Sequence, residues 1–189
     1  MTDTVSGSRA RTRQAILDAA IGVFARNPAA PLGDVAVAAG VGRTTLHRYY
    51  ADRAELLTAL RVEAGERLEA ARLRARINDG TGADAVRRLG QEYFDLGDIL
   101  SLLFNEQVSF EAETTTGGGG CDPEFTAMVL RGHADGTIDP SLPADWVQSV
   151  LWAQLYAGWG YLAEQRVSRH EALRLILHSL GGALRSTST

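Results

Sequence analysis

The chain has 189 residues, of which 45% are hydrophobic and 22% are charged, and its formal net charge is −4 at pH 7. These values are ordinary for a globular protein that is long enough to bury a sizeable core in one or two domains. All 19 basic residues are arginines, which excludes sites that need a lysine, such as a Walker-type phosphate site, a Schiff base or a pyridoxal anchor.

The composition favours helices, because Ala, Leu, Arg and Glu dominate and only 5 prolines occur. Strand-like alternation is scarce, so we predict an all-α fold. Charge is unevenly placed: residues 1–60 hold seven arginines against five acidic residues, whereas the rest of the chain is acidic. A mildly basic N-terminal segment of an acidic protein can bind DNA, because binding depends on the local electrostatic potential and not on the net charge of the whole chain.

Residues 1–8 are small and polar, lack the apolar core of a secretory signal, and are expected to be unstructured. A first long helix is predicted over residues 11–26. Its buried face should consist of residues at helical spacing, namely Ile16, Ala20, Val23 and Phe24. Arg9, Arg11 and Arg13 at its start are either solvated helix residues or an arm that touches DNA, and the sequence leaves both open.

Two short helices joined by a glycine turn are predicted next. The first covers residues 33–39, Gly40 ends it, and the second runs from Arg43 to Tyr49 or Tyr50. Leu46 and Tyr50 lie four residues apart and should point inward. The outward face would then carry polar side chains, namely Arg43, Thr44, Thr45, His47 and Arg48.

This arrangement is typical of a helix-turn-helix, whose second helix enters the DNA major groove. Arginine can bind guanine through two hydrogen bonds, and threonine can contact either base edges or a thymine methyl group. His47 and Arg48 could reach phosphates, which supply affinity rather than sequence information. An ordinary helical hairpin with a solvated polar face has the same pattern, because short helix-turn-helix patterns recur by chance.

The segment AGVGRTTLHRYYADRAELL, with RQAILDAAIGVFA upstream, resembles the N-terminal domain of TetR-family transcriptional regulators. Ala39-Gly40-Val41 matches the family's turn, Thr45-Leu46 matches its Thr-Leu pair, and Tyr50 stands where Phe is usual. The chain departs from the family pattern at His47, where Tyr is usual, and at Arg53, where Lys is usual. Ala30-Pro31 stands in place of the usual Ser or Thr before the first short helix.

The resemblance implies a homodimer that binds a double-stranded DNA operator. We expect Arg43, Thr44 and Thr45 to contact bases. The residues expected to contact phosphates are His47, Arg48, Tyr49 and Arg53.

A long helix is predicted from Asp52, which should cap it together with Glu55, to about Ile77. Its buried side chains are expected to be Leu56, Leu57, Leu60, Leu68 and Leu73. Further helices are predicted over residues 83–96, 99–110, 123–134, 145–164 and 168–185. The segment TTTGGGGC, ending at Cys121, is expected to be a surface loop.

The helix over residues 145–164 is apolar on nearly all sides, so more than one side should be buried. Together with the last helix it suggests a dimer built as a four-helix bundle, although both helices could also complete a monomer core. Aromatic and amide side chains of this part could line a small-molecule pocket, and each could equally be core. They are Tyr93, Phe104, Gln107, Trp152, Tyr156 and Trp159.

No metal, cofactor or catalytic site is expected. The four histidines form no zinc motif, and no nucleophile–base pair is evident. The lone cysteine suits a reducing compartment, and no apolar run approaches the roughly 18 residues of a membrane helix, so we expect a cytoplasmic protein.

The sequence therefore predicts a helix-turn-helix DNA-binding domain over residues 9–55 and a helical regulatory and dimerisation domain over 56–189. The predicted function is a ligand-responsive transcriptional repressor that an unknown small molecule releases from a palindromic operator. Two alternatives remain, namely an effector-independent DNA-binding architectural or regulatory protein and an all-α enzyme.

Overall fold

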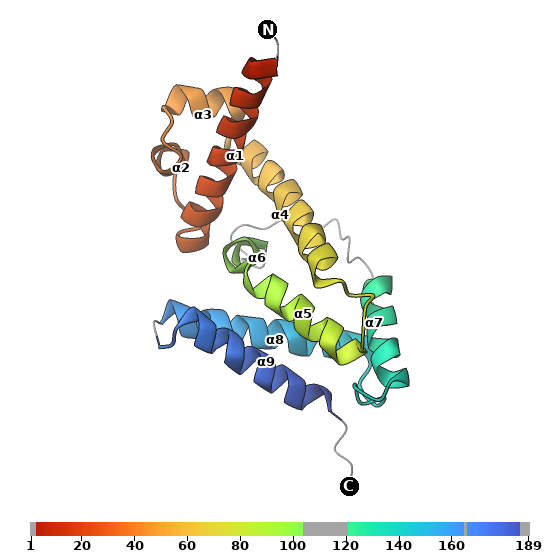
Figure 1. The fold of residues 1–189 in the computed structure, drawn as a ribbon. Coiled ribbons are helices and arrows are strands. Elements are labelled where there is room, and N and C mark those ends of the chain that lie inside the picture. The colour runs from red at the N-terminus through yellow and green to blue at the C-terminus, as the bar shows by residue number, and fades with distance from the viewer. Residues whose placement is uncertain (1–2, 104–120, 165, 186–189) are drawn as a thin grey trace. The chain divides into compact units, whose positions relative to one another are not determined.

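The computed structural model describes residues 3–103, 121–164 and 166–185. Over these ranges the chain forms helices and turns without a strand, which confirms the all-α prediction (Figure 1). The helices are α1 (Asp3–Arg26), α2 (Leu32–Ala38), α3 (Arg43–Tyr49), α4 (Arg53–Ala75), α5 (Gly82–Phe94), α6 (Gly97–Leu103), α7 (Pro123–Ala134), α8 (Ala144–Ala163) and α9 (Arg169–Leu184).

The described residues fall into two compact units. The N-terminal unit comprises residues 3–67 and 98–103, and the C-terminal unit comprises residues 68–97, 121–164 and 166–185. Helix α4 contributes residues to both units. Phe104, Gln107 and most of the TTTGGGGC segment lie outside the described residues. No described helix is long and apolar enough to cross a membrane.

Helix α1 supplies much of the core of the N-terminal unit. Its buried side chains are Ile16, Leu17, Ala20, Ile21 and Phe24. The prediction that Val23 is buried was wrong, since Val23 is only partly buried. At about 100° per residue, the five buried positions 16, 17, 20, 21 and 24 cover one continuous arc of the helix, and position 23 lies just outside the edge of that arc.

The start of α1 also differs from the prediction. The helix begins at Asp3, whereas residues 1–8 were expected to be unstructured. Small polar residues and Gly7 are weak helix formers, but a helix that is already held by its packed part gains one hydrogen bond for each residue added. Thr12 Oγ1 also donates to the Ser8 carbonyl at 3.0 Å. Propensity alone therefore placed this boundary too late.

Helix α4 begins with the predicted cap. Asp52 accepts a hydrogen bond from the Glu55 backbone N–H at 2.9 Å, and the Glu55 carboxylate accepts one from the Ala51 N–H at 2.7 Å. Leu56 and Leu60 are buried as predicted, and Leu57 and Leu68 are partly buried. Leu73 is 69% exposed, so its predicted burial was wrong. The buried stripe continues instead through the alanines Ala64, Ala71 and Ala75.

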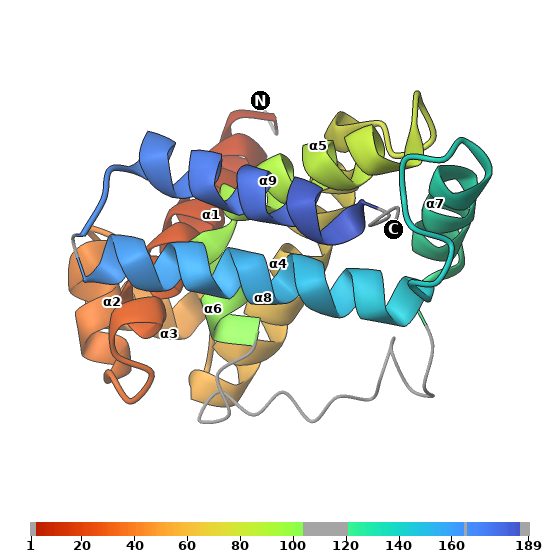
Figure 2. The same ribbon diagram turned by 90° about the horizontal axis from the view of Figure 1, so that it is seen from below.

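The C-terminal unit is built from α5, α7, α8 and α9. Helices α8 and α9 run alongside each other, and α5 packs against both of them and against α7 (Figure 1 and Figure 2). Ser168 caps α9 by accepting a hydrogen bond from the Glu171 N–H at 3.2 Å. The core of this unit includes Val86, Leu89 and Phe94 of α5, and Leu151 and Leu155 of α8.

Helix α8 is less enclosed by its own chain than its apolar sequence suggested. Val147, Leu151 and Leu155 are buried, whereas Trp146 is 56% exposed and Tyr161 44% exposed. The apolar side chains of α8 thus exceed what α5, α7 and α9 cover.

Candidate DNA-binding surface and ligand cavity

The turn between α2 and α3 fixes the position of α3. Gly40 has a φ of +65°, which glycine adopts without steric cost. The Val41 N–H donates to the Ala36 carbonyl at 2.9 Å and so closes the corner. Leu46 and Tyr50 are 1% and 3% exposed, which confirms that these side chains point inward. The opposite face of α3 is therefore turned away from the core of its unit.

That opposite face carries the residues predicted to contact DNA. Arg43, Thr44, His47 and Arg48 are exposed, and Thr45 and Tyr49 are partly buried. In the described part of the chain, no carboxylate forms an ion pair with Arg43 or Arg48. Two exposed arginines of this short helix therefore have no ion-pair partner among the described residues.

Arg43 rests against the first turn of α2. A Cβ placed on Gly33 would lie 3.0 Å from Arg43 Nη2, so the glycine leaves room for the guanidinium. The Arg43 side chain and His47 also border a shallow depression of about 170 Å³ that includes Pro31 and Leu32. Arg43 thus lies at the edge between α2 and α3 where a groove-bound helix would meet base edges.

Tyr49 lies between two arginines. The guanidinium carbons of Arg9 and Arg48 are 5.8 and 5.9 Å from the centre of its ring. Such distances fit cation–π contacts. Arg9, which the sequence left as either a solvated residue or part of a DNA-binding arm, is therefore beside the exposed face of α3. Arg11 and Arg13 do not share this contact.

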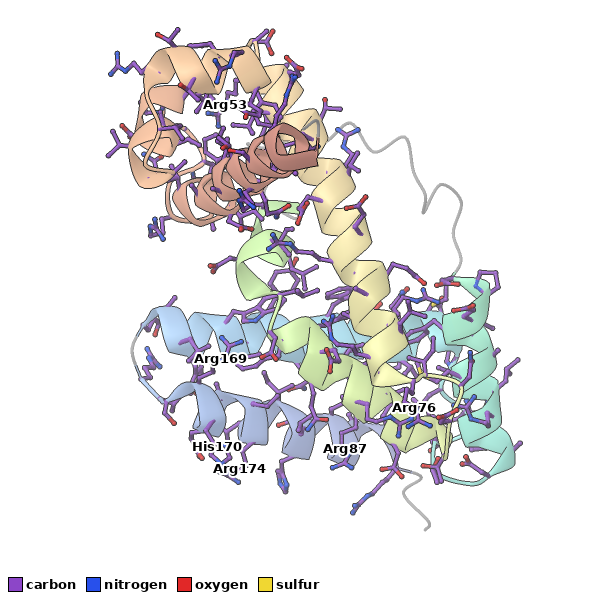
Figure 3. All side chains as sticks on the ribbon, turned by 45° about the horizontal axis from the view of Figure 1, so that its top comes forward. Arg53, Arg76, Arg87, Arg169, His170 and Arg174 are labelled. Carbon is purple, nitrogen blue, oxygen red and sulfur yellow. The ribbon has the colours of Figure 1, made fainter. Side chains whose placement is uncertain are left out.

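His47 and Arg53 make backbone contacts. His47 Nδ1 lies 3.0 Å from the Ala51 carbonyl, which can only accept, so Nδ1 is the nitrogen that donates in this hydrogen bond. The Arg53 guanidinium donates to the carbonyls of Ala30, at 2.7 Å, and Pro28, and it lies 4.2 Å from the centre of the Phe24 ring (Figure 3). Arg53 is thus engaged within its own unit.

The C-terminal unit encloses a cavity of about 40 Å³. Tyr93 of α5 and Trp152 of α8, both predicted ligand contacts, line it and stack with ring centres 5.4 Å apart and planes 10° from parallel. Burial raises the pKa of the Tyr93 hydroxyl above its ordinary value. The remaining lining residues are Arg72, Ile77, Leu89, Asp122, Phe125, Gln148 and Leu151.

The other two described candidates, Tyr156 and Trp159, do not line this cavity. Trp159 donates its indole N–H to the Phe94 carbonyl at 3.2 Å and does not line the cavity. Tyr156 is 42% exposed and meets Trp159 edge-on. Phe104 and Gln107 fall outside the described residues. Among the described candidates, Tyr93 and Trp152 therefore line this cavity together, whereas Tyr156 and Trp159 are not among its lining residues.

The sequence did not indicate the charged residues of the cavity. The guanidinium of Arg72, on α4, forms ion pairs with Asp122 and Glu124 at the start of α7. Asp122 caps α7 by accepting from the Glu124 N–H at 3.0 Å. The Asp-Pro-Glu sequence at 122–124 signals a helix start, but nothing in it identifies the arginine that it meets.

Cys121 donates its thiol hydrogen to Gln148 Oε1 at 3.1 Å. Burial raises the pKa of the Cys121 thiol, which disfavours the reactive thiolate. In the described part of the chain, no group of three His, Cys, Asp or Glu side chains could hold a metal ion.

Comparison with known proteins gives a consistent result. Residues 16–60 match the sequence model described as "Bacterial regulatory proteins, tetR family". The chain is 38% identical, over 183 residues, to the HTH-type transcriptional repressor LfrR of Mycolicibacterium smegmatis, with 93% of this chain and 91% of the relative covered.

Solved structures of LfrR from Mycobacterium smegmatis are similar as well. One crystal structure has a TM-score of 0.65 at 32% identity, covering 91% of this chain and 99% of that one. A second, in complex with proflavine, has a TM-score of 0.66 at 34% identity, covering 94% and 99%. With its helix-turn-helix and this level of identity over nearly its whole length, the chain belongs to the TetR family of bacterial transcriptional regulators.

Proposed function

We propose that this protein is a homodimeric, cytoplasmic repressor without catalytic activity that binds a palindromic operator and releases it when a small molecule occupies the C-terminal unit. The observation that carries the proposal is the exposed face of α3, where Arg43 and Arg48 stand without an acidic neighbour in the described part of the chain. The relative LfrR is named a transcriptional repressor, which supports repression as the direction of control.

The residues of α3 divide into two groups by position. Arg43, Thr44 and Thr45 open the helix, where side chains of a recognition helix meet base edges. His47, Arg48 and Tyr49 lie at its other end and are better placed for phosphates, which fix the orientation of the protein on the duplex. Arg9, beside Tyr49, would add a phosphate contact from α1.

We assign residues 9–55 to DNA binding and residues 56–189 to regulation and dimerisation. A dimer would place two copies of α3 in successive major grooves about 34 Å apart. The exposed apolar residues of α8 support this assignment, as does a shallow depression of about 230 Å³ between α8 and α9 that includes Ala157, Tyr161 and Leu175.

The effector class follows from the relative and from the cavity. LfrR has been crystallised with proflavine, which is a planar aromatic cation. In this chain the stacked Tyr93 and Trp152 rings and the acidic Asp122 border one cavity, and these are groups that a flat cation requires. We therefore propose a planar aromatic cation as the effector. Its binding would favour a conformation that no longer fits the operator.

The experiment first selects the preferred operator from random DNA with the purified protein and then compares variants by fluorescence anisotropy. Arg43→Ala should weaken specific binding by about 1–3 kcal/mol and relax the preference at one base position. The matched control is Arg87→Ala, since Arg87 is an exposed arginine of α5 in the other unit (Figure 3), and it should leave affinity unchanged. The absence of any selected sequence, or equal losses on specific and non-specific DNA, would contradict base reading by Arg43.

A second candidate function is DNA-binding regulation without an effector. It is favoured by the size of the cavity, which at about 40 Å³ is far below the roughly 300–1,000 Å³ of ligand pockets. Under this alternative, operator binding would be insensitive to proflavine at concentrations well above micromolar. A titration of the protein–operator complex with proflavine separates the two functions.

A further inference from the structure

The cavity of the C-terminal unit contains an ion pair with an excess of donors. Arg72 binds Asp122 through Nη1 and Glu124 through Nη2, and its side chain is only 18% exposed. The third donor, Nε, is buried and has no hydrogen-bond partner in the described part of the chain, because Glu69 stands 3.7 Å away. A buried donor without a partner costs free energy, so this pairing is incompletely satisfied.

The wall beside Arg72 is aromatic. Tyr93 and Trp152 stack nearly in parallel and line the same cavity as Arg72 and Asp122. A guanidinium is itself a planar, delocalised cation that stacks on aromatic rings and binds carboxylates. The Arg72 guanidinium therefore gives Asp122 the positive partner that a flat aromatic cation would also give it, in a cavity that the two stacked rings line as well.

The size of the cavity requires that something move when a ligand binds. About 40 Å³ has room for little more than a water molecule. Leu89 and Leu151 on its wall are core residues, at 2% and 1% exposure. Arg72, with its long and flexible side chain, can leave the cavity for solvent without disturbing that core.

We propose that the Arg72 guanidinium occupies the place of the effector: a planar aromatic cation stacks on Tyr93 and Trp152, binds Asp122, and displaces Arg72 into solvent. This inference rests on the proposed function, since it specifies how the same cavity accepts the proposed ligand class. Under this proposal the Arg72 side chain competes with the ligand. Because Arg72 occupies the site in the unliganded protein, it lowers the affinity for the ligand.

The displacement has a consequence for regulation. The Arg72 ion pairs join α4 to the first turn of α7, and α4 also provides Leu56 and Leu60 to the core of the N-terminal unit. A ligand that displaces Arg72 releases this connection. By linkage, the ligand and the α4–α7 ion pairs oppose each other, and a variant that lacks the ion pairs should bind the ligand more tightly.

The test measures proflavine binding to the full-length protein by fluorescence anisotropy. Arg72→Gln removes the competing charge and should tighten binding by at least about fivefold, the lower end of typical coupling between sites. Asp122→Asn keeps a residue able to cap α7 but removes the carboxylate, and it should weaken binding. Opposite changes in proflavine affinity in the two variants would support the displacement, because general damage to the unit would weaken binding in both.

Arg74→Gln is the matched control, since Arg74 lies on the same helix and pairs with Glu92 of α5 at 2.7 Å. It should leave proflavine affinity unchanged. Acridone is a neutral molecule of the same ring system. The Arg72→Gln substitution should increase the affinity for acridone less than it increases the affinity for proflavine. Circular dichroism melting confirms that each variant is folded.

Two failures are distinguishable. If proflavine binds the unmodified protein and releases its operator, but Arg72→Gln binds it no more tightly, the displacement is wrong and the proposed function stands. If proflavine binds neither the unmodified protein nor Arg72→Gln, both the displacement and the proposed effector class are wrong.

Discussion

At the level of single residues, Arg53 combines hydrogen bonds to the backbone with an aromatic contact. It stacks on Phe24 and donates to the carbonyls of Pro28 and Ala30, in the connection that leads from α1 to α2. A planar guanidinium can make these contacts together, whereas a lysine ammonium cannot donate in the same fork geometry. Arg53 is therefore built to hold the 28–30 connection, and through it the position of α2.

We predict that Arg53→Lys and Arg53→Gln lower the free energy of unfolding by about 1–3 kcal/mol, because lysine lacks the fork that reaches both carbonyls and glutamine lacks the charge as well. Urea denaturation measures the loss. Operator binding provides the second readout. If Arg53 only holds the 28–30 connection, the slope of log K for operator binding against the logarithm of the salt concentration should be the same in Arg53→Gln as in the parent protein. If Arg53 contacts a phosphate, its loss should reduce the magnitude of that slope by about one.

The sequence predicted part of this surface and missed the rest for a physical reason. Helical spacing alone placed Leu46 inward and Arg43 outward, and both predictions hold. The contacts of Arg53 depend on carbonyls 23 and 25 residues earlier in the chain. The ion pairs of Arg72 likewise join residues about fifty apart. Spacing within one helix carries no information about such partners.

Among the elements, α5 and α7 approach each other closely. A Cβ on Gly82 would lie 2.3 Å from Gly132 Cα and 2.8 Å from the Met128 carbonyl oxygen, and backbone atoms cannot move aside easily. Two glycines thus allow the first turn of α5 to cross α7. This contact anchors the end of the C-terminal unit where the Asp135–Pro140 turn follows α7.

Gly82→Ala should therefore lower the free energy of unfolding by about 1–3 kcal/mol through overpacking. Gly65→Ala is the matched control within α4, because nothing lies within 4 Å of the added methyl group. Alanine there should raise stability by about 0.5–1 kcal/mol through helix propensity. Chemical denaturation of both variants measures the difference, and equal effects of the same sign would contradict the close crossing.

Asp135 holds the same crossing by hydrogen bonds. Its carboxylate accepts from the Gly82 N–H at 2.9 Å and from the Thr137 N–H at 3.0 Å. The hydrogen bond from the Thr137 hydroxyl, at 2.5 Å, is the largest cause that lowers the pKa of Asp135 below its usual value. A lowered folded-state pKa means that this stabilisation is present above the unfolded pKa, about 3.9, and disappears as pH falls through the folded value.

We accordingly predict that Asp135→Asn is less stable than the parent protein at pH 7, and that the difference narrows at pH 3. Denaturation curves at the two pH values measure it. Asp84→Asn serves as a control of the same charge change on α5. A difference that stays constant with pH would show that the Asp135 carboxylate charge does not matter.

Element boundaries were predictable where the chain has explicit signals. Helix α7 begins at Pro123 and ends before Asp135-Gly136, as predicted, because proline and a cap start it and Gly136 takes a φ of +75°. Helix α1 has no such signal at its start and was placed eight residues late. The orientation of α8 was also undetermined, because a helix that is apolar on nearly all sides does not indicate which side meets its neighbours.

For the whole molecule, the decisive question is what covers the outward face of α8 and α9. That face includes Ala157, Tyr161 and Leu175, and a second copy of the chain could cover it with the same residues. In a two-fold interface one substitution acts twice. A glutamate placed there would bury two uncompensated carboxylates, at a cost of several kcal/mol.

We predict that Ala157→Glu converts the proposed dimer to a monomer while retaining its helix content. Sedimentation equilibrium measures the association, and circular dichroism measures the helix content. The control is Leu130→Glu, because Leu130 of α7 is 57% exposed and lies outside the α8–α9 depression. It should remain dimeric. Operator affinity should fall steeply in Ala157→Glu, since the two half-sites no longer bind as one linked unit. If the Ala157→Glu variant is monomeric and still binds a full operator with unchanged affinity, one copy of α3 is sufficient for binding. That result would contradict the proposed palindromic operator, but it would not contradict DNA binding by the helix-turn-helix.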